Sequence, residues 1–169
     1  MIQIYCDASF RMGVGGMAVV AGACEPWELS GLRSWRLCWN VAERRMRELV
    51  VFHAGCRCGN SGEAELRAMG MAFIVACELM RVRGEWRAEI VSDSLSAIRE
   101  VMGNKGGPPF LENIQRLWRQ RRIILSKVGA HRGNRFNEIS DACSRWARIE
   151  TEKKLRSRFS NRRSIRREN

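Results

Sequence analysis

The first nine residues, 1–9, carry the pattern that most constrains the fold. Apolar Ile2, Ile4 and Cys6 alternate with more polar residues, which predicts a β-strand with one buried face. The pattern ends at Asp7, where a carboxylate stands at the point at which a core strand would enter a turn. Taken alone, Asp7 is best interpreted as a solvated turn residue, and only the rest of the chain argues otherwise.

The remaining pattern alternates between strands and helices. Runs of β-branched and other apolar residues predict further strands at 17–21, 49–54, 88–92 and 123–128. Helical periodicity and capping residues predict helices at about 60–80, 94–102, 108–118 and 137–149. We therefore predict an α/β fold whose five-stranded mixed sheet has three antiparallel strands followed by parallel strands, with flanking helices.

The clearest helix begins near Asn60. Asn60 and Glu63 have the spacing of a capping box, and Glu65 is expected in the first turn. The buried stripe of this helix is predicted from apolar residues at helical spacing: Leu66, Met69, Gly70, Phe73, Cys77 and Met80.

The last helix, 137–149, is expected to turn Trp146 inward and to place Asp141 at the edge of its apolar stripe.

The formal net charge of +12 favours a polyanionic partner. Nucleic acid is the leading interpretation and an anionic membrane surface is the second, because each phosphate contacted releases condensed counterions. The segment 151–169 holds eight Lys or Arg against two Glu, which is about half of the net charge. We predict a basic, flexible tail there, following a domain that covers 1–150.

The seven cysteines do not form a repeating framework, so we expect free thiols in a reducing compartment rather than a disulfide scaffold. Cys56, Cys58 and His53 supply three zinc ligands at most, which is one too few for a structural zinc site. No apolar run is long enough to span a membrane, and the N-terminus has no secretory signal pattern. We therefore expect a soluble, cytoplasmic monomer without membrane contact.

The segment 23–47 separates the second and third predicted strands. It interleaves Trp27, Trp35 and Trp39 with several arginines. Such a composition suits either a small packed subdomain, which we favour, or a surface that stacks on nucleic acid.

Four carboxylates fall at related places in the predicted fold. Asp7 ends the first strand, Asp93 ends the fourth, Glu65 opens the first helix and Asp141 lies on the last helix. If the first and fourth strands are parallel neighbours, their carboxyl ends bring Asp7 and Asp93 side by side. Crowded carboxylates require a hard divalent cation, so the cluster on a basic protein indicates metal-assisted cleavage of a phosphodiester backbone.

Over about residues 1–148, the chain resembles the type 1 ribonucleases H. Any one matching block is weak evidence, but five in the same order are specific, and the interval from His131 to Asp141 is typical of the family. The match rests on these blocks: Tyr5-Cys6-Asp7-Ala8-Ser9, Ala64-Glu65-Leu66-Arg67-Ala68, Val91-Ser92-Asp93-Ser94, Lys127-Val128-Gly129-Ala130-His131 and Asn137-Glu138-Ile139-Ser140-Asp141.

The resemblance implies an endonuclease that hydrolyses the RNA strand of RNA/DNA hybrids and leaves 5′-phosphate and 3′-hydroxyl ends. It implies that two Mg²⁺ ions, with Mn²⁺ as an alternative, are held by four carboxylates. His131 would assist the attacking water or product release. The implied metal ligands, which together with His131 are the implied catalytic residues, are Asp7, Glu65, Asp93 and Asp141.

The same resemblance implies that Asn60, Ser61 and Gly62 grip the RNA backbone near the cut, and that the turn at Gly13 approaches the same strand. The interval from Asp93 to His131 is too short for the basic helix that many bacterial members use to bind substrate. We therefore hypothesise that the basic tail replaces that helix. The competing functions are a junction resolvase-like nuclease of the same superfamily and a non-catalytic hybrid-binding module.

Overall fold

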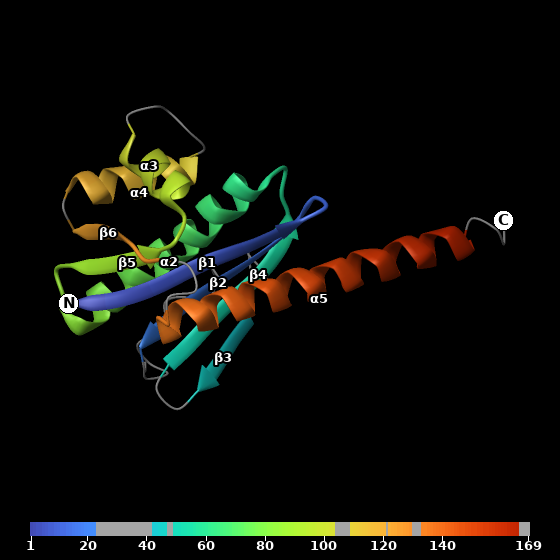
Figure 1. Cartoon of the computed structure of the whole chain (residues 1–169), viewed down its shortest axis with the longest axis horizontal. Helices are drawn as coiled ribbons and strands as arrows, with labels where there is room; N and C mark the ends of the chain where they lie inside the picture. Colours follow the sequence, from blue (N-terminus) through green and yellow to red (C-terminus); the bar gives the residue numbers. More distant parts are fainter. Residues whose placement is uncertain (23–41, 47–48, 104–108, 121, 130–132, 166–169) are drawn as a thin grey trace.

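A computed structural model describes residues 1–22, 42–46, 49–103, 109–120, 122–129 and 133–165. Strands and helices alternate along the chain as the sequence pattern predicts (Figure 1). The strands are β1 (Ile2–Arg11), β2 (Val14–Gly22), β3 (Ala42–Met46), β4 (Leu49–Arg57), β5 (Ala88–Ser92) and β6 (Ile123–Lys127). The helices are α2 (Ser61–Arg83), α3 (Leu95–Met102), α4 (Pro109–Arg119) and α5 (Arg135–Ile165).

These strands form one sheet in the order β3-β4-β2-β1-β5-β6. Strands β1, β2 and β4 make an antiparallel meander, and β5 and β6 extend it in parallel through helical crossovers. The predicted five-stranded mixed sheet is therefore confirmed. The sheet has in addition an edge strand, β3, which pairs antiparallel to β4 and comes from the predicted insertion. The three tryptophans of that insertion, Trp27, Trp35 and Trp39, lie outside the described residues.

Strand β1 is longer than predicted, because its antiparallel pairing with β2 continues to Arg11 opposite Val14. Asp7 therefore lies inside β1, opposite Ala18, and not at the end of the strand. Only the parallel pairing with β5 stops early, at Tyr5 opposite Val91. β1 and β5 therefore stop pairing two residues before Asp7, although β1 itself continues.

Helix α2 covers one face of the sheet and forms the centre of the core. Asn60 caps its N-terminus by accepting a hydrogen bond from the Glu63 amide at 2.8 Å, as predicted. Glu63 in turn accepts from the Gly59 amide at 2.7 Å, one residue before the position that a capping box predicts. The predicted stripe is buried apart from half-buried Cys77, and the core includes further α2 residues on both sides of it: Ala68, Met71, Ala72, Val75, Ala76 and Leu79.

Helix α5 covers the opposite face, where two glycines allow a close approach. Gly16 and Gly55 are paired across β2 and β4. A methyl group on Gly16 would collide with the backbone of Ser144 and Arg148, and one on Gly55 would lie 2.9 Å from the carbonyl oxygen of Ala147. The side chains that α5 buries are accordingly small: Asn137, Ser140, Ser144 and Ala147.

This close approach corrects the predicted orientation of the last helix. Trp146 is 43% exposed, so the prediction that it points inward is wrong. A small-residue face, one position away from the apolar stripe, contacts the sheet. Bulky Ile139 and Cys143 pack at the side, against a second apolar cluster formed by Val20, Leu49 and Val51.

Helix α5 also continues beyond the predicted end near residue 149, so the segment 151–165 is helical (Figure 1). No glycine or proline interrupts 135–165. Pairs one turn apart support the extension: Arg148 with Glu152, and Lys153 with Glu150 at 3.0 Å. The predicted division at residue 150 therefore falls within a continuous helix.

None of the described helices combines the length and the apolar composition needed to cross a bilayer. The cysteines that the structure describes are all free thiols: Cys6, Cys56, Cys58, Cys77 and Cys143.

We predict that Gly16→Ala lowers the thermal stability, because the added methyl group meets helix backbone that no rotamer change can move away. Overpacking of this kind costs about 1–3 kcal/mol, and each kcal/mol lowers Tm by roughly 2–4 °C at this chain length. Thermal unfolding followed by circular dichroism measures the loss.

Gly22→Ala is the matched control, because a methyl group at Gly22 meets nothing within 4 Å. Its free energy of unfolding should stay within about 1 kcal/mol of the wild-type value. Equal Tm values for the two variants would show that α5 does not depend on the glycine contact.

Candidate active site

The parallel pairing of β1 with β5 brings two carboxylates together. Ile4 lies opposite Ile90 and Tyr5 opposite Val91. Continuing this register by two residues places Asp7 opposite Asp93. The pairing ends before that point, so the two carboxylates lie where the strands begin to separate. This is the position at which open α/β sheets bind their ligands.

Glu65 reaches the same place from helix α2. It is the fifth residue of the helix, just beyond the first turn in which the sequence analysis expects it. Electrostatic repulsion from Asp7 and Asp93 contributes to the raised pKa of Glu65, so its carboxyl group lies within range of both. Three carboxylates from three different elements therefore gather at one edge of the β1–β5 pair.

Helix α5 supplies the fourth carboxylate, Asp141, together with a hydrogen bond that the sequence did not predict. The Ser144 hydroxyl lies 3.1 Å from Oδ2 of Asp7 and 2.9 Å from the carbonyl oxygen of Asp141. Ser144 is fully buried, so this contact is shielded from solvent. The Asp141 carboxylate accepts a hydrogen bond from Arg145, which lies one turn further along α5.

The raised pKa values at the site show that gathering these carboxylates is electrostatically unfavourable. Burial and repulsion by Asp93 raise the pKa of Asp7 to about 7, with a smaller contribution from Asp141, and the Ser144 contact partly opposes the rise. Burial and repulsion by Asp7 and Asp93 raise the pKa of Glu65 to about 8. The same carboxylates, together with burial, raise the pKa of the Cys6 thiol. A nearby positive charge would relieve all of these shifts.

A hard divalent cation suits this donor set, because carboxylate oxygens are its preferred protein ligands and two of these groups are disfavoured as anions without it. As they stand, however, no three His, Cys, Asp or Glu side chains in the described part of the chain are grouped so that they could hold a metal ion. His131 lies outside the described residues.

The predicted substrate-binding residues lie close in space at the start of α2. Asn60 is the N-cap, Ser61 begins the helix and Gly62 follows it. Gly13 belongs to the β1–β2 turn, with a φ of 78°, and its carbonyl oxygen accepts a hydrogen bond from the Cys58 amide at 3.1 Å. The turn is therefore tied to the chain two residues before Asn60.

The N-terminus of α5 is fixed to β1 by contacts that the sequence reasoning also missed. Asn134 accepts hydrogen bonds from the amides of Phe136 and Asn137, both at 3.1 Å. The ring of Phe136 stacks on Tyr5, with 5.2 Å between ring centres. Asn134, immediately before the first residue of the helix, is a recognisable N-cap signal, whereas the Tyr5 contact has no sequence signature.

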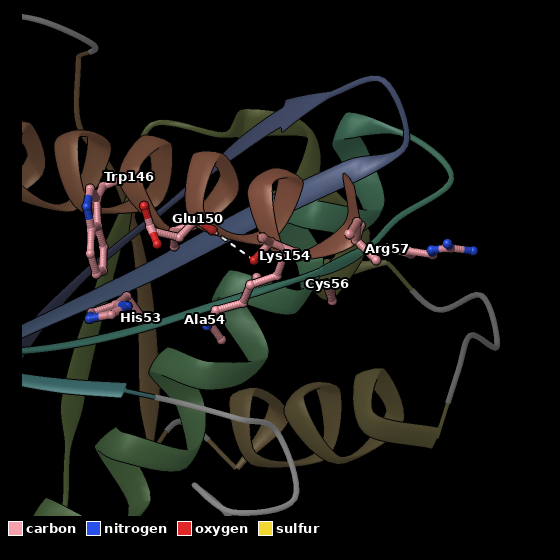
Figure 2. Close-up of a pocket in the computed structure, with 11 residues that line it drawn as sticks. His53, Ala54, Cys56, Arg57, Trp146, Glu150 and Lys154 are labelled. Carbon is pink, nitrogen blue, oxygen red and sulfur yellow. Dashed lines mark hydrogen bonds between the residues drawn. The ribbon is translucent and has the colours of Figure 1, made fainter. Parts of the chain in front are cut away.

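The zinc alternative is not supported by the sheet geometry. Ala54 and Cys56 face the α2 side of the sheet, where both contact the main core. His53 faces the other side, where its ring lies edge-on to Trp146 with 4.8 Å between centres (Figure 2). The sheet therefore separates His53 from Cys56.

A cavity of about 430 Å³ lies between β4 and α5 (Figure 2). His53 and Arg57 line it from the strand, and Trp146, Glu150 and Lys154 line it from the helix. None of the four carboxylates lines this cavity, so it does not belong to the candidate site.

The order of the strands and the flanking helices define a ribonuclease H-like α/β fold. One similar structure is the N-terminal ribonuclease H domain of a Mycobacterium tuberculosis protein, solved as a fusion with maltose-binding protein. It has a TM-score of 0.61 and 17% sequence identity, and the match covers 92% of this chain and 99% of that one.

A second similar structure is a foamy viral protease–reverse transcriptase in complex with double-stranded DNA. It has a TM-score of 0.58 and 17% identity, and the match covers 87% of this chain and 93% of that one. No protein-family model and no curated protein sequence matches the chain. The similarity is therefore one of fold, and the chemistry has to be argued from the residues of this chain.

We predict that Glu65→Gln stabilises the metal-free protein at pH 8 but not at pH 5. Folding raises the pKa of Glu65 from 4.5 to about 8, so the wild-type protein loses stability as the pH rises between these values. The substitution removes the ionisable group and with it this loss. The gain at pH 8 should be about 1 kcal/mol or more, or roughly 2–4 °C in Tm. Thermal unfolding in EDTA at both pH values measures it.

Adding Mg²⁺ at pH 8 should raise the Tm of the wild type more than that of Glu65→Gln, because the cation relieves the repulsion that the substitution has already removed. Glu100→Gln, at an exposed position on α3, is the matched control and should follow the wild type. A pH dependence of Glu65→Gln identical to that of the wild type would contradict the proposed clustering.

Proposed function

We propose that this protein is a ribonuclease H: it hydrolyses the RNA strand of RNA/DNA hybrids and leaves 5′-phosphate and 3′-hydroxyl ends. The observation that carries the proposal is the group of mutually repelling carboxylates on a ribonuclease H-like fold. Burial, and after it the repulsion among Asp7, Glu65 and Asp93, raises the pKa of Asp7 and of Glu65. A purely structural core gains nothing from such a cluster.

The proposed metal ligands are the carboxylates of Asp7, Glu65, Asp93 and Asp141. Two Mg²⁺ ions bound there would lower the pKa of the attacking water and stabilise the leaving oxygen. The protein contributes the arrangement of the donors, which come from β1, from the turn that follows β5, and from helices on both faces of the sheet. His131, in the segment between β6 and α5, is proposed to assist proton transfer or product release.

Two of these carboxylates are positioned by their neighbours. The buried Ser144 hydroxyl fixes one oxygen of Asp7 and leaves the other directed elsewhere. Arg145 holds one oxygen of Asp141 from the exposed side of α5. We propose that both contacts keep the acids apart enough for cations to enter between them, so that Ser144 and Arg145 are positioning residues.

Substrate binding is proposed at two places. Asn60, Ser61 and Gly62, next to the turn at Gly13, would contact the RNA backbone. The second place is the C-terminal half of α5, where Lys153, Lys154 and Arg156 are exposed. Such side chains would add sequence-independent attraction for phosphates.

We predict that Asp93→Asn lowers cleavage of an end-labelled RNA/DNA hybrid at least about a hundredfold, since a neutral amide is a much weaker ligand than a carboxylate for a hard divalent cation. Binding of the hybrid should persist or tighten, because repulsion of the phosphates decreases. Gel analysis of the cleavage products, with and without Mg²⁺, and a filter-binding assay measure the two effects.

Glu100→Gln is the control for this assay as well, and should cleave like the wild type. Duplex RNA, duplex DNA and a four-way junction distinguish the alternatives. Cleavage of the junction in preference to the hybrid would indicate a resolvase-like nuclease. Binding of the hybrid without cleavage by the wild type would indicate a non-catalytic module, and unchanged cleavage by Asp93→Asn would refute the assigned site.

We predict that replacing Lys153, Lys154 and Arg156 together by Gln raises KM for the hybrid and leaves kcat unchanged. Each lost phosphate contact should reduce the slope of log affinity against log salt by about 0.9. Gln keeps a high helix propensity, so circular dichroism should show an intact α5. An unchanged salt slope would exclude this part of α5 from substrate binding.

A further inference from the structure

A tryptophan is exposed at the end of the molecule opposite to the C-terminal end of α5. Trp86 lies in the turn between α2 and β5, close to the N-terminus of the chain (Figure 1), and is 66% exposed. The guanidinium carbon of Arg87 lies 3.8 Å from the centre of its ring. One face of the indole is therefore covered by a cation, which fixes the ring and leaves its other surface available for stacking.

This end of the molecule also carries positive charge that the neighbouring acids do not neutralise. Glu78 pairs with Arg81 at 2.7 Å, and Glu85 pairs with the N-terminal amino group at 3.3 Å. Arg119 and Arg122 are exposed and have no carboxylate partner within the described part of the chain. These two arginines lie on either side of the short connection between α4 and β6.

Two hollows lie at this end of the molecule, one lined by Trp86 and the other by its neighbour Arg87. One, of about 540 Å³, is lined by Arg87, Trp118 and Arg119 together with the first residues of β6. The other, of about 510 Å³, is lined by Trp86, Arg122 and the end of α2. Both reach Ile123. We call the continuous area formed by Trp86, Arg87, Trp118, Arg119 and Arg122 the Trp86 surface.

We propose that the Trp86 surface binds single-stranded nucleic acid, with a base stacked on Trp86 and phosphates held by Arg119 and Arg122. An exposed ring beside unpaired arginines is the combination that sequence-independent single-strand binding uses. An acidic peptide would use the charge but not the flat ring. Binding here does not depend on the proposed hydrolysis, although a single-stranded extension of a hybrid would be a suitable ligand.

The Trp86 surface is separate from the carboxylate cluster. Trp86 precedes β5 and Asp93 follows it, so they lie roughly 20 Å apart along the strand at 3.3 Å per residue. A nucleic acid bound at the carboxylates would have to continue for several nucleotides beyond them to reach Trp86. The surface would therefore favour hybrids that continue into a single strand over blunt hybrids.

The test measures binding of a fluorescein-labelled oligonucleotide of twelve deoxythymidines to the full chain, by fluorescence anisotropy in EDTA. Trp86→Ala should weaken binding about fivefold or more, as expected for one lost stacking contact. Trp86→Phe should recover most of the affinity, because it keeps a stacking ring. The salt slope should be unchanged in both variants, whereas Arg119→Gln combined with Arg122→Gln should reduce it by one to two.

Met102→Ala is the matched control, since Met102 is a large exposed apolar side chain outside the Trp86 surface. It should bind like the wild type. Wild-type affinity of both Trp86→Ala and the double arginine variant would refute the proposal. If the same variants instead lost affinity for a labelled poly-glutamate peptide, the surface would be assigned to an acidic protein partner. Because EDTA prevents metal-dependent cleavage, these results stand whether or not the protein hydrolyses hybrids.

Discussion

The close contact of α5 with the paired glycines Gly16 and Gly55 is the constraint on which the candidate site depends. With side chains at these positions, the helix would lie farther from the sheet. The 3.1 Å hydrogen bond from Ser144 to Asp7 would then be lost, and Asp141 would move away from the other carboxylates. Gly16 and Gly55 thus determine how closely the oxygen atoms of Ser144 and Asp141 approach Asp7.

This arrangement stabilises the fold at one place and destabilises it at another. Close packing of small residues gives α5 extensive van der Waals contact with β2 and β4. The same contact helps to bury Asp7, and burial together with repulsion by Asp93 holds the pKa of Asp7 well above its ordinary range. The packing of the helix must therefore offset an electrostatic cost that a nearby cation would reduce.

Period-two patterns, helix caps and apolar stripes are enough to predict the mixed sheet and helix α2, because these depend on local sequence and burial. The length of β1 was missed, since its last residues are held by β2 and not by an apolar pattern. The prediction that Trp146 points inward rests on the apolar stripe that it shares with Ile139 and Cys143, whereas the glycines opposite α5 select small residues. Ser144 was not predicted as part of the site, because a serine acquires that role only through the docking angle of α5.

The net charge of +12 and the carboxylate cluster also explain each other. An acidic site repels the phosphates of any nucleic acid, so a protein that uses one must gain its affinity elsewhere on its surface. Exposed basic side chains occur on the C-terminal part of α5 and around Trp86, and β1, which carries Asp7, lies between these two ends of the molecule (Figure 1). Attraction at both ends would orient a long polyanion across the acidic region, and cations bound there would then offset the remaining repulsion.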